Sequence, residues 1–329
     1  MKGKTYNTIF FIAGLLTLCY MVYKIGLHVV WNNITQTGIW FLPVIASWLV
    51  IYMLNALALR EIIYEKKLPN TSVKFLPTLK LTISGYAINY ITPLVALGGE
   101  PYRIMELKNK VGINKATSSV LLYTIMHIFS HIIFWMASII LILLYLNPGT
   151  KVLILCIVTF VVFFGMAFWV YKKYKLGLLV ITFRSLGRLP FLKKRMALFM
   201  GKKEKDLNEI DTHIKELFTE RKPTFYVALT WEFIARVVGC LEIYFVGLAI
   251  HANISLFESI IISAGSSLFA NLLFFSPMQL GTREGGLVLA LKSIGMNGGI
   301  GIFIGLVTRI RELFWILLGL LIMRIPTKF

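Results

Sequence analysis

Six apolar stretches, each about as long as a lipid bilayer is thick, constrain this chain more than any other feature. They are 7–27, 39–59, 118–146, 152–171, 224–250 and 300–323. A helix needs about 20 predominantly apolar residues to cross the hydrocarbon core. Because 57% of the residues are hydrophobic and only 15% are charged, the composition is that of an integral membrane protein. We therefore predict an all-α polytopic fold, with a single transmembrane domain over 1–329.

Two further regions are apolar but broken, which raises the expected number of membrane segments to about eight. They cover 76–97 and 257–297. Proline removes a backbone donor and glycine relaxes the backbone, so such residues end or bend helices. The residues expected to break these helices are Pro93, Gly98, Gly99, Pro101, Pro277 and Gly281.

Basic residues in short loops predict the orientation of the chain. Lysine and arginine gather at the N-terminus and in 60–80, 98–118 and 172–222, whereas the remaining loops hold almost none. Since basic loops stay on the cytoplasmic side, the N-terminus and these three loops are expected there. The broken segment 76–97 then starts and ends on the cytoplasmic side, as a re-entrant hairpin or a split pair. The segment 257–297 starts and ends on the outer side.

The two broken regions share a spacing that indicates an internal repeat. Pro93 and Glu100 are seven residues apart, as are Pro277 and Glu284, and 184 residues separate the two pairs. The same shift superimposes the apolar spans on either side. The repeat units would be about 39–146 and 224–323, in opposite orientations. Two unrelated helix breaks are the alternative.

The loop 172–222 holds fourteen basic and six acidic residues and so contributes +8 to the formal net charge of +19. Apolar and basic residues alternate over 183–195, a pattern typical of an interfacial helix on anionic headgroups; an ordinary solvated connector is the alternative. Since the basic residues lie in loops between apolar spans, we expect membrane lipids and not nucleic acid as partners. Cys19, Cys156 and Cys240 lie in apolar stretches and are expected to be buried free thiols.

Charged residues inside the apolar spans are the candidate functional residues, because burying charge in a membrane is costly. Candidate binding residues for an anionic substrate are Arg103, Arg236, Arg283, Arg309 and Arg311. Candidate charge partners or proton carriers are Glu100, Glu232, Glu284, Glu312 and His127. Helices that begin at the breaks would also present backbone N–H groups at their N-termini, which can bind an anion. Ion pairs that only join helices are the alternative.

Motifs for enzymatic chemistry are missing from the sequence. Asp206 and Asp211 are the only aspartates, so no aspartate-rich metal–diphosphate motif is available. His127 and His131 are one helical turn apart but lack a clear third ligand. No P-loop or nucleophile elbow is present. We expect no catalytic residue, no metal and no cofactor.

The residues around the breaks resemble those of a known family. The stretches 98–108 (GGEPYRIMELK) and 276–286 (SPMQLGTREGG) are similar to the two signature stretches of the flippase-like family. This family comprises the transmembrane domain of lysylphosphatidylglycerol synthases and its stand-alone relatives. The resemblance implies lipid translocation between leaflets. The soluble aminoacyl-transferase domain of the synthases has no counterpart here, so lipid aminoacylation is not expected.

Three functions remain open at this point. The favoured one is a translocase in a bacterial cytoplasmic (inner) membrane that moves an anionic or lipid-linked substrate. An intramembrane lipid-modifying enzyme is the second, with His127 and Glu100 as its only candidate pair. A regulatory or structural subunit of an envelope-lipid complex, docking through 172–222, is the third.

Overall fold

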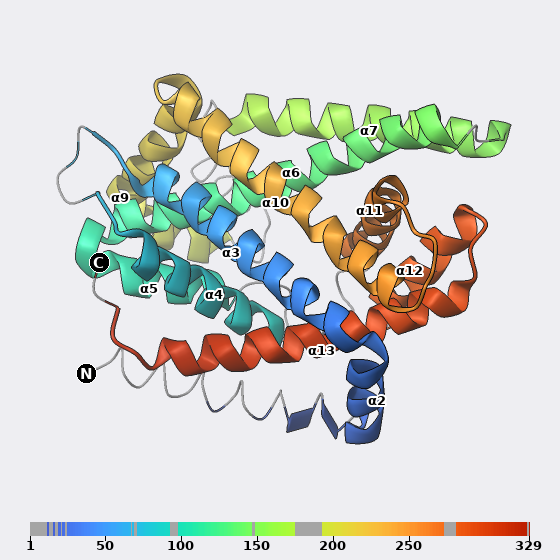
Figure 1. The fold of residues 1–329 in the computed structure, drawn as a ribbon. Helices are drawn as coiled ribbons and strands as arrows, with labels where there is room; N and C mark the ends of the chain where they lie inside the picture. The colour runs from blue at the N-terminus through green and yellow to red at the C-terminus, as the bar shows by residue number, and fades with distance from the viewer. Residues whose placement is uncertain are drawn as a thin grey trace.

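The computed structural model describes residues 25–66, 71–92, 98–146, 149–174, 193–272 and 281–327, with Ile12, Leu16, Cys19, Tyr20, Val22, Tyr23, Leu68 and Phe329. Every regular element in this part of the chain is a helix (Figure 1). The helices are α2 (Leu27–Thr37), the short 3-10 helix η1 (Gly38–Trp40), α3 (Phe41–Ile63), α4 (Phe75–Ile91), α5 (Gly99–Val111), α6 (Ile113–Tyr145), α7 (Thr150–Tyr174), α9 (Lys193–Thr219), α10 (Lys222–Ala249), α11 (Leu256–Leu272), α12 (Thr282–Ser293) and α13 (Gly298–Met323).

Five of the six expected spans coincide with helices, namely α3 with η1, α6, α7, α10 and α13. Most of the first span, 7–27, lies outside the described residues. By length and hydropathy alone, Leu27–Ile63 and Ile113–Tyr145 qualify as membrane-crossing helices, and Leu153–Trp169 and Leu256–Leu272 are shorter apolar helices. The all-helical prediction is therefore confirmed.

The first broken region consists of α4 and α5, which pack against each other. A Cβ on Gly99 would lie 2.2 Å from the carbonyl oxygen of Gly85, so only glycine permits this approach. The backbone N–H of Gly99 donates to Asn89 Oδ1 at 2.6 Å. Pro101 is the third residue of α5, at a position where a helix needs no backbone donor. Pro93 lies outside the described residues.

The second broken region consists of α11 and α12, which also pack together. Gly281 precedes α12 with φ of +80°, a conformation that favours glycine, and its N–H donates to Glu284 Oε2 at 2.9 Å. Gly286 lies against Ser266, where a Cβ would come within 3.0 Å of the Ser266 Cα. Pro277 lies outside the described residues.

The helices α3 and α10 lie side by side along the centre of the molecule and run in opposite directions (Figure 1). Around them, α13 packs on α4, and α6 packs on α5 and α11. In the same view the α4–α5 pair lies at one end of the molecule and the α11–α12 pair at the other.

The loop 172–222 contains α9, which packs against α6, α7 and α10. Its buried side chains follow helical spacing and include Leu207, Ile210, Ile214, Leu217 and Phe218. This half of α9 is therefore part of the protein core. Most of the expected interfacial segment, 183–195, lies outside the described residues.

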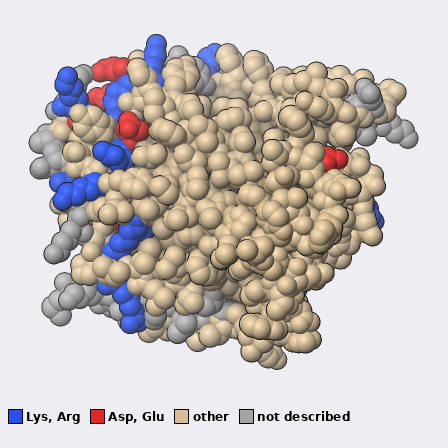
Figure 2. Space-filling view, in the orientation of Figure 1, with Lys and Arg blue, Asp and Glu red and all other residues tan. Residues whose placement is uncertain are grey.

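Charge is unevenly distributed over the surface. Figure 2 shows lysine, arginine and acidic side chains gathered over the end where α3 ends and α10 begins, while most of the remaining face is uncharged. All three cysteines are free. Cys156 and Cys240 are buried as expected, but Cys19 is exposed, because an apolar helix can face outward as well as inward.

Candidate functional site

A group of charged side chains joins α3, α10, α12 and α13 in the interior. We call it the second charged cluster, because most of its residues lie in the second half of the chain. It comprises Trp48, Glu242, Arg283, Glu284, Arg309, Arg311 and Glu312. Its best-defined contact is bidentate: Arg311 Nε and Nη2 donate to Glu242 Oε1 and Oε2 at 2.8 and 2.9 Å. The Arg311 guanidinium lies 3.6 Å from the centre of the Trp48 ring, and Trp48 Nε1 donates to Glu242 at 2.9 Å.

The other charges of this cluster also pair with one another. Arg309 Nε donates to Glu284 Oε1 at 2.9 Å, and its Nη1 donates to Glu312 Oε2 at 3.2 Å. Arg283 pairs with Glu312 as well. Three arginines thus face three glutamates, so the cluster is charge-balanced. Such matching stabilises charge that would be prohibitively costly to bury alone.

Another group of polar and charged side chains joins α4, α5, α6 and α10. We call it the first charged cluster, because most of its residues lie in the first half of the chain. It comprises Tyr86, Glu100, Arg103, Tyr123, His127, Glu232 and Arg236. His127 Nδ1 lies 2.8 Å from Glu232 Oε2, and His127 Nε2 lies 2.8 Å from Arg236 Nη2. Arg236 Nη2 also lies 2.7 Å from His127 Nδ1, so the guanidinium contacts both ring nitrogens. Glu232 is 0% exposed, and its Oε1 has no hydrogen-bond partner.

Arg103 occupies the other side of the first charged cluster. Its Nη1 donates to Glu100 Oε1 at 3.2 Å, and its guanidinium lies 5.0 Å from the centre of the Tyr86 ring and 5.3 Å from that of Tyr123. The two tyrosine hydroxyls are 3.1 Å apart, and that of Tyr86 is also 3.1 Å from His127 Nδ1. Aromatic and polar contacts therefore link Arg103 to His127.

Every candidate binding residue and charge partner expected from the sequence belongs to one of the two clusters. The structure separates them into two sets, and it pairs His127 with Glu232 and not with Glu100. Glu242 and the aromatic residues Trp48, Tyr86 and Tyr123 were not among the site residues predicted from the sequence. Glu242 carried a signal, since it is an acid within an apolar span; aromatic residues in such spans carry none.

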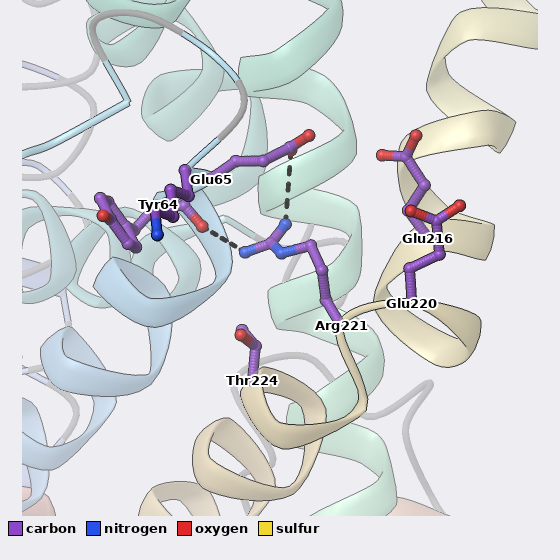
Figure 3. A pocket seen from close by; sticks show the side chains of 7 residues that line it. Tyr64, Glu65, Glu216, Glu220, Arg221 and Thr224 are labelled. Atoms are coloured by element: carbon purple, nitrogen blue, oxygen red, sulfur yellow. Dashed lines mark hydrogen bonds and ion pairs between the residues drawn. The ribbon is translucent and has the colours of Figure 1, made fainter.

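A third polar group lies at the charged end and was not expected. Lys115 and Arg221 both pair with Glu65, and Arg221 also donates to the backbone oxygens of Ile62 and Tyr64 at the end of α3. Figure 3 shows Arg221 between Glu65 and Glu216, beside a cavity of about 260 Å³. Burial alone would raise the pKa of Glu65, but the hydrogen bond and charge of Lys115, with the charge of Arg221, lower it.

The same group contains the one metal-ligand set found among the described residues, formed by Glu65, His213 and Glu216. Lys115 and Arg221 already neutralise Glu65, which makes the set a poor site for a cation. His127 and His131 belong to no such set in the described part of the chain. Their rings lie 5.4 Å apart, and His131 packs on Trp135.

These features define a helical membrane protein with charged residues in its interior. The family model described as the lysylphosphatidylglycerol synthase TM region matches residues 8–319, and the chain belongs to this family. It is therefore a multi-pass membrane protein. No curated protein and no solved structure gives a match.

Proposed function

We propose that the protein is a lipid translocase that moves an anionic or lipid-linked substrate between the leaflets of a bacterial cytoplasmic membrane. The observation that carries this proposal is the pair of charged clusters enclosed by membrane helices. Ionisable groups are retained at such positions mainly where a polar substrate, an ion or a proton must pass. Membership in a transmembrane family supports the membrane location, and the lipid substrate is our inference.

An inverted repeat would give these clusters a role in alternating access. The contacts between helices support such a repeat. The unit 39–146 contains α3 to α6, and the unit 224–323 contains α10 to α13. Contacts of α3 with α4 and of α5 with α6 have counterparts in those of α10 with α11 and of α12 with α13. Between the units, α4 packs on α13 as α11 packs on α6.

Single contacts follow the 184-residue shift as well. His127 pairs with Glu232. Adding 184 to His127 gives Arg311, subtracting 184 from Glu232 gives Trp48, and Arg311 and Trp48 also contact each other. Trp135 Nε1 donates to Ser267, and their counterparts Gly319 and Ile83 lie in close contact. Unrelated helix breaks would not produce matched contacts between the halves.

We assign the charged end of the molecule to the cytoplasmic side of the membrane, and we expect the N-terminus on the same side. It carries the loop after α3, the start of α10 and α9 (Figure 1). Basic residues stay on this side of a membrane. The α4–α5 pair would then enter from the cytoplasmic side and the α11–α12 pair from the outer side, with the charged clusters between them.

A leaflet-exposure assay tests the proposal. Purified protein is reconstituted into liposomes that contain a fluorescent phosphatidylglycerol, and the accessible fraction is measured with a membrane-impermeant quencher. We expect the protein to change the rate at which inner-leaflet lipid becomes accessible, compared with protein-free liposomes. Mass spectrometry of the lipids after the assay separates transport from an enzyme. A new lipid species without movement would reject translocation in favour of lipid modification.

A further inference from the structure

Arg103, in the second turn of α5, keeps one edge of its guanidinium unpaired although the side chain is only 1% exposed. On the paired side, Nη1 donates to Glu100 Oε1 at 3.2 Å. On the other side, neither Nε nor Nη2 has a hydrogen-bond partner. A buried charged donor without an acceptor is costly, so an acceptor is expected at this edge.

The second charged cluster shows what such an edge binds in this protein. Arg311 uses its Nε and Nη2 to hold both carboxylate oxygens of Glu242, at 2.8 and 2.9 Å. The matching atoms of Arg103 present the same fork with no protein carboxylate opposite it. The geometry selects two oxygens of one oxyanion, such as a phosphate or a carboxylate.

The surroundings hold the Arg103 guanidinium without supplying that acceptor. The rings of Tyr86 and Tyr123 lie about it, and a ring face attracts the cation but takes no in-plane N–H. On α4, a Cβ at Gly85 would lie 2.5 Å from Arg103 Nε, so a larger residue there would displace the guanidinium. Arg103 is therefore fixed in place with its fork unsatisfied.

We propose that Arg103 is the residue that binds the phosphate of the lipid headgroup, through Nε and Nη2. This rests on the proposed function and narrows it, because it assigns the phosphate to the first charged cluster. In the second cluster, the matching edge of Arg311 already holds a glutamate, so that pair acts as a lock between α10 and α13.

Calorimetric titration of the full-length protein in neutral detergent tests this assignment. The probes are dihexanoyl phosphatidic acid, inorganic phosphate and dihexanoylglycerol, which lacks the phosphate. We expect phosphatidic acid to bind and dihexanoylglycerol not to bind. Arg103→Lys, which keeps the charge but loses the fork, should weaken binding about 10-fold to 100-fold. Lys108→Gln removes a charge from the exposed face of the same helix and should leave binding unchanged.

Two results would overturn the assignment. Unchanged affinity in Arg103→Lys would show that the fork does not bind the phosphate. Equal affinity for inorganic phosphate and phosphatidic acid would reject the lipid as the occupant and leave a free-anion site. If the variant does not fold, cryo-electron microscopy of the wild-type protein with phosphatidic acid decides the question. Density joined to Arg103 Nε and Nη2 supports the proposal, and an empty fork rejects it.

Binding and transport can fail separately. Phosphatidic acid bound at Arg103 by a protein that moves no lipid in liposomes would refute the proposed function and keep the site. Lipid movement that persists in folded Arg103→Lys at the wild-type rate would refute the site and keep the function.

Discussion

The Arg311–Glu242 pair gives a quantitative test of the lock between α10 and α13. Arg311→Met leaves Glu242 as a buried carboxylate that has lost both guanidinium donors, although Trp48 still donates to it. Breaking one partner of a buried pair costs about 3–5 kcal/mol, whereas replacing both by apolar residues of similar size is often neutral. For a chain of this length, such a loss lowers the melting temperature by about 4–7 °C.

The assay is a double-mutant cycle on thermal unfolding in detergent, using Arg311→Met, Glu242→Leu and the double variant. We expect each single variant to be strongly destabilised and the double variant to recover most of the loss, with a coupling of at least about 2 kcal/mol. Lipid movement should recover together with stability, because the pair holds helices and does not bind substrate. Additive losses, or a stable double variant that moves no lipid, would refute the lock.

Three further predictions follow from other parts of the molecule. Because the pKa of Glu65 is lowered from its ordinary value of 4.5, its contribution to stability should be complete above pH 4.5 and be lost as the pH falls through the lower pKa of the folded state. Glu65→Gln should therefore flatten the pH dependence of the free energy of unfolding in that acidic range. An unchanged pH profile in this variant would contradict the prediction. Glu232→Gln mimics a protonated carboxylate beside His127, so it should keep the fold and remove the pH dependence of lipid movement; a wild-type pH profile would exclude a proton-carrying role. Single cysteines at Lys66 and Lys108, in a background without the native cysteines, should react with an impermeant reagent from one face and a cysteine at Asn253 from the other; opposite faces for the first two would reject the α4–α5 hairpin.

The sequence was sufficient to predict the helices, because α3, α6 and α13 lie in long apolar runs with few charges. The same signal located both broken regions, since glycine and proline interrupt them. The family resemblance stated from 98–108 and 276–286 is confirmed by a match over 8–319. The repeat and the orientation stay predictions.

Pairing between charges could not be read from the sequence. Glu242 and Arg311 are 69 residues apart and His127 and Glu232 are 105 apart, so only the packing of the helices decides which partners meet. The unpaired fork of Arg103 depends on the position of Glu100 and on the missing side chain at Gly85, which no spacing rule encodes. Burial of one face of α9 likewise depends on its contacts with α6 and α10.

The most direct test of translocation compares two variants that each remove one positive charge. Arg236→Gln removes the guanidinium beside His127 while leaving an amide that can still donate to the ring, and Arg60→Gln removes an exposed charge near the end of α3. In the leaflet-exposure assay, folded Arg236→Gln protein should move no lipid, and Arg60→Gln should retain lipid movement. Equal, wild-type rates in both variants would contradict a transport role for the first charged cluster.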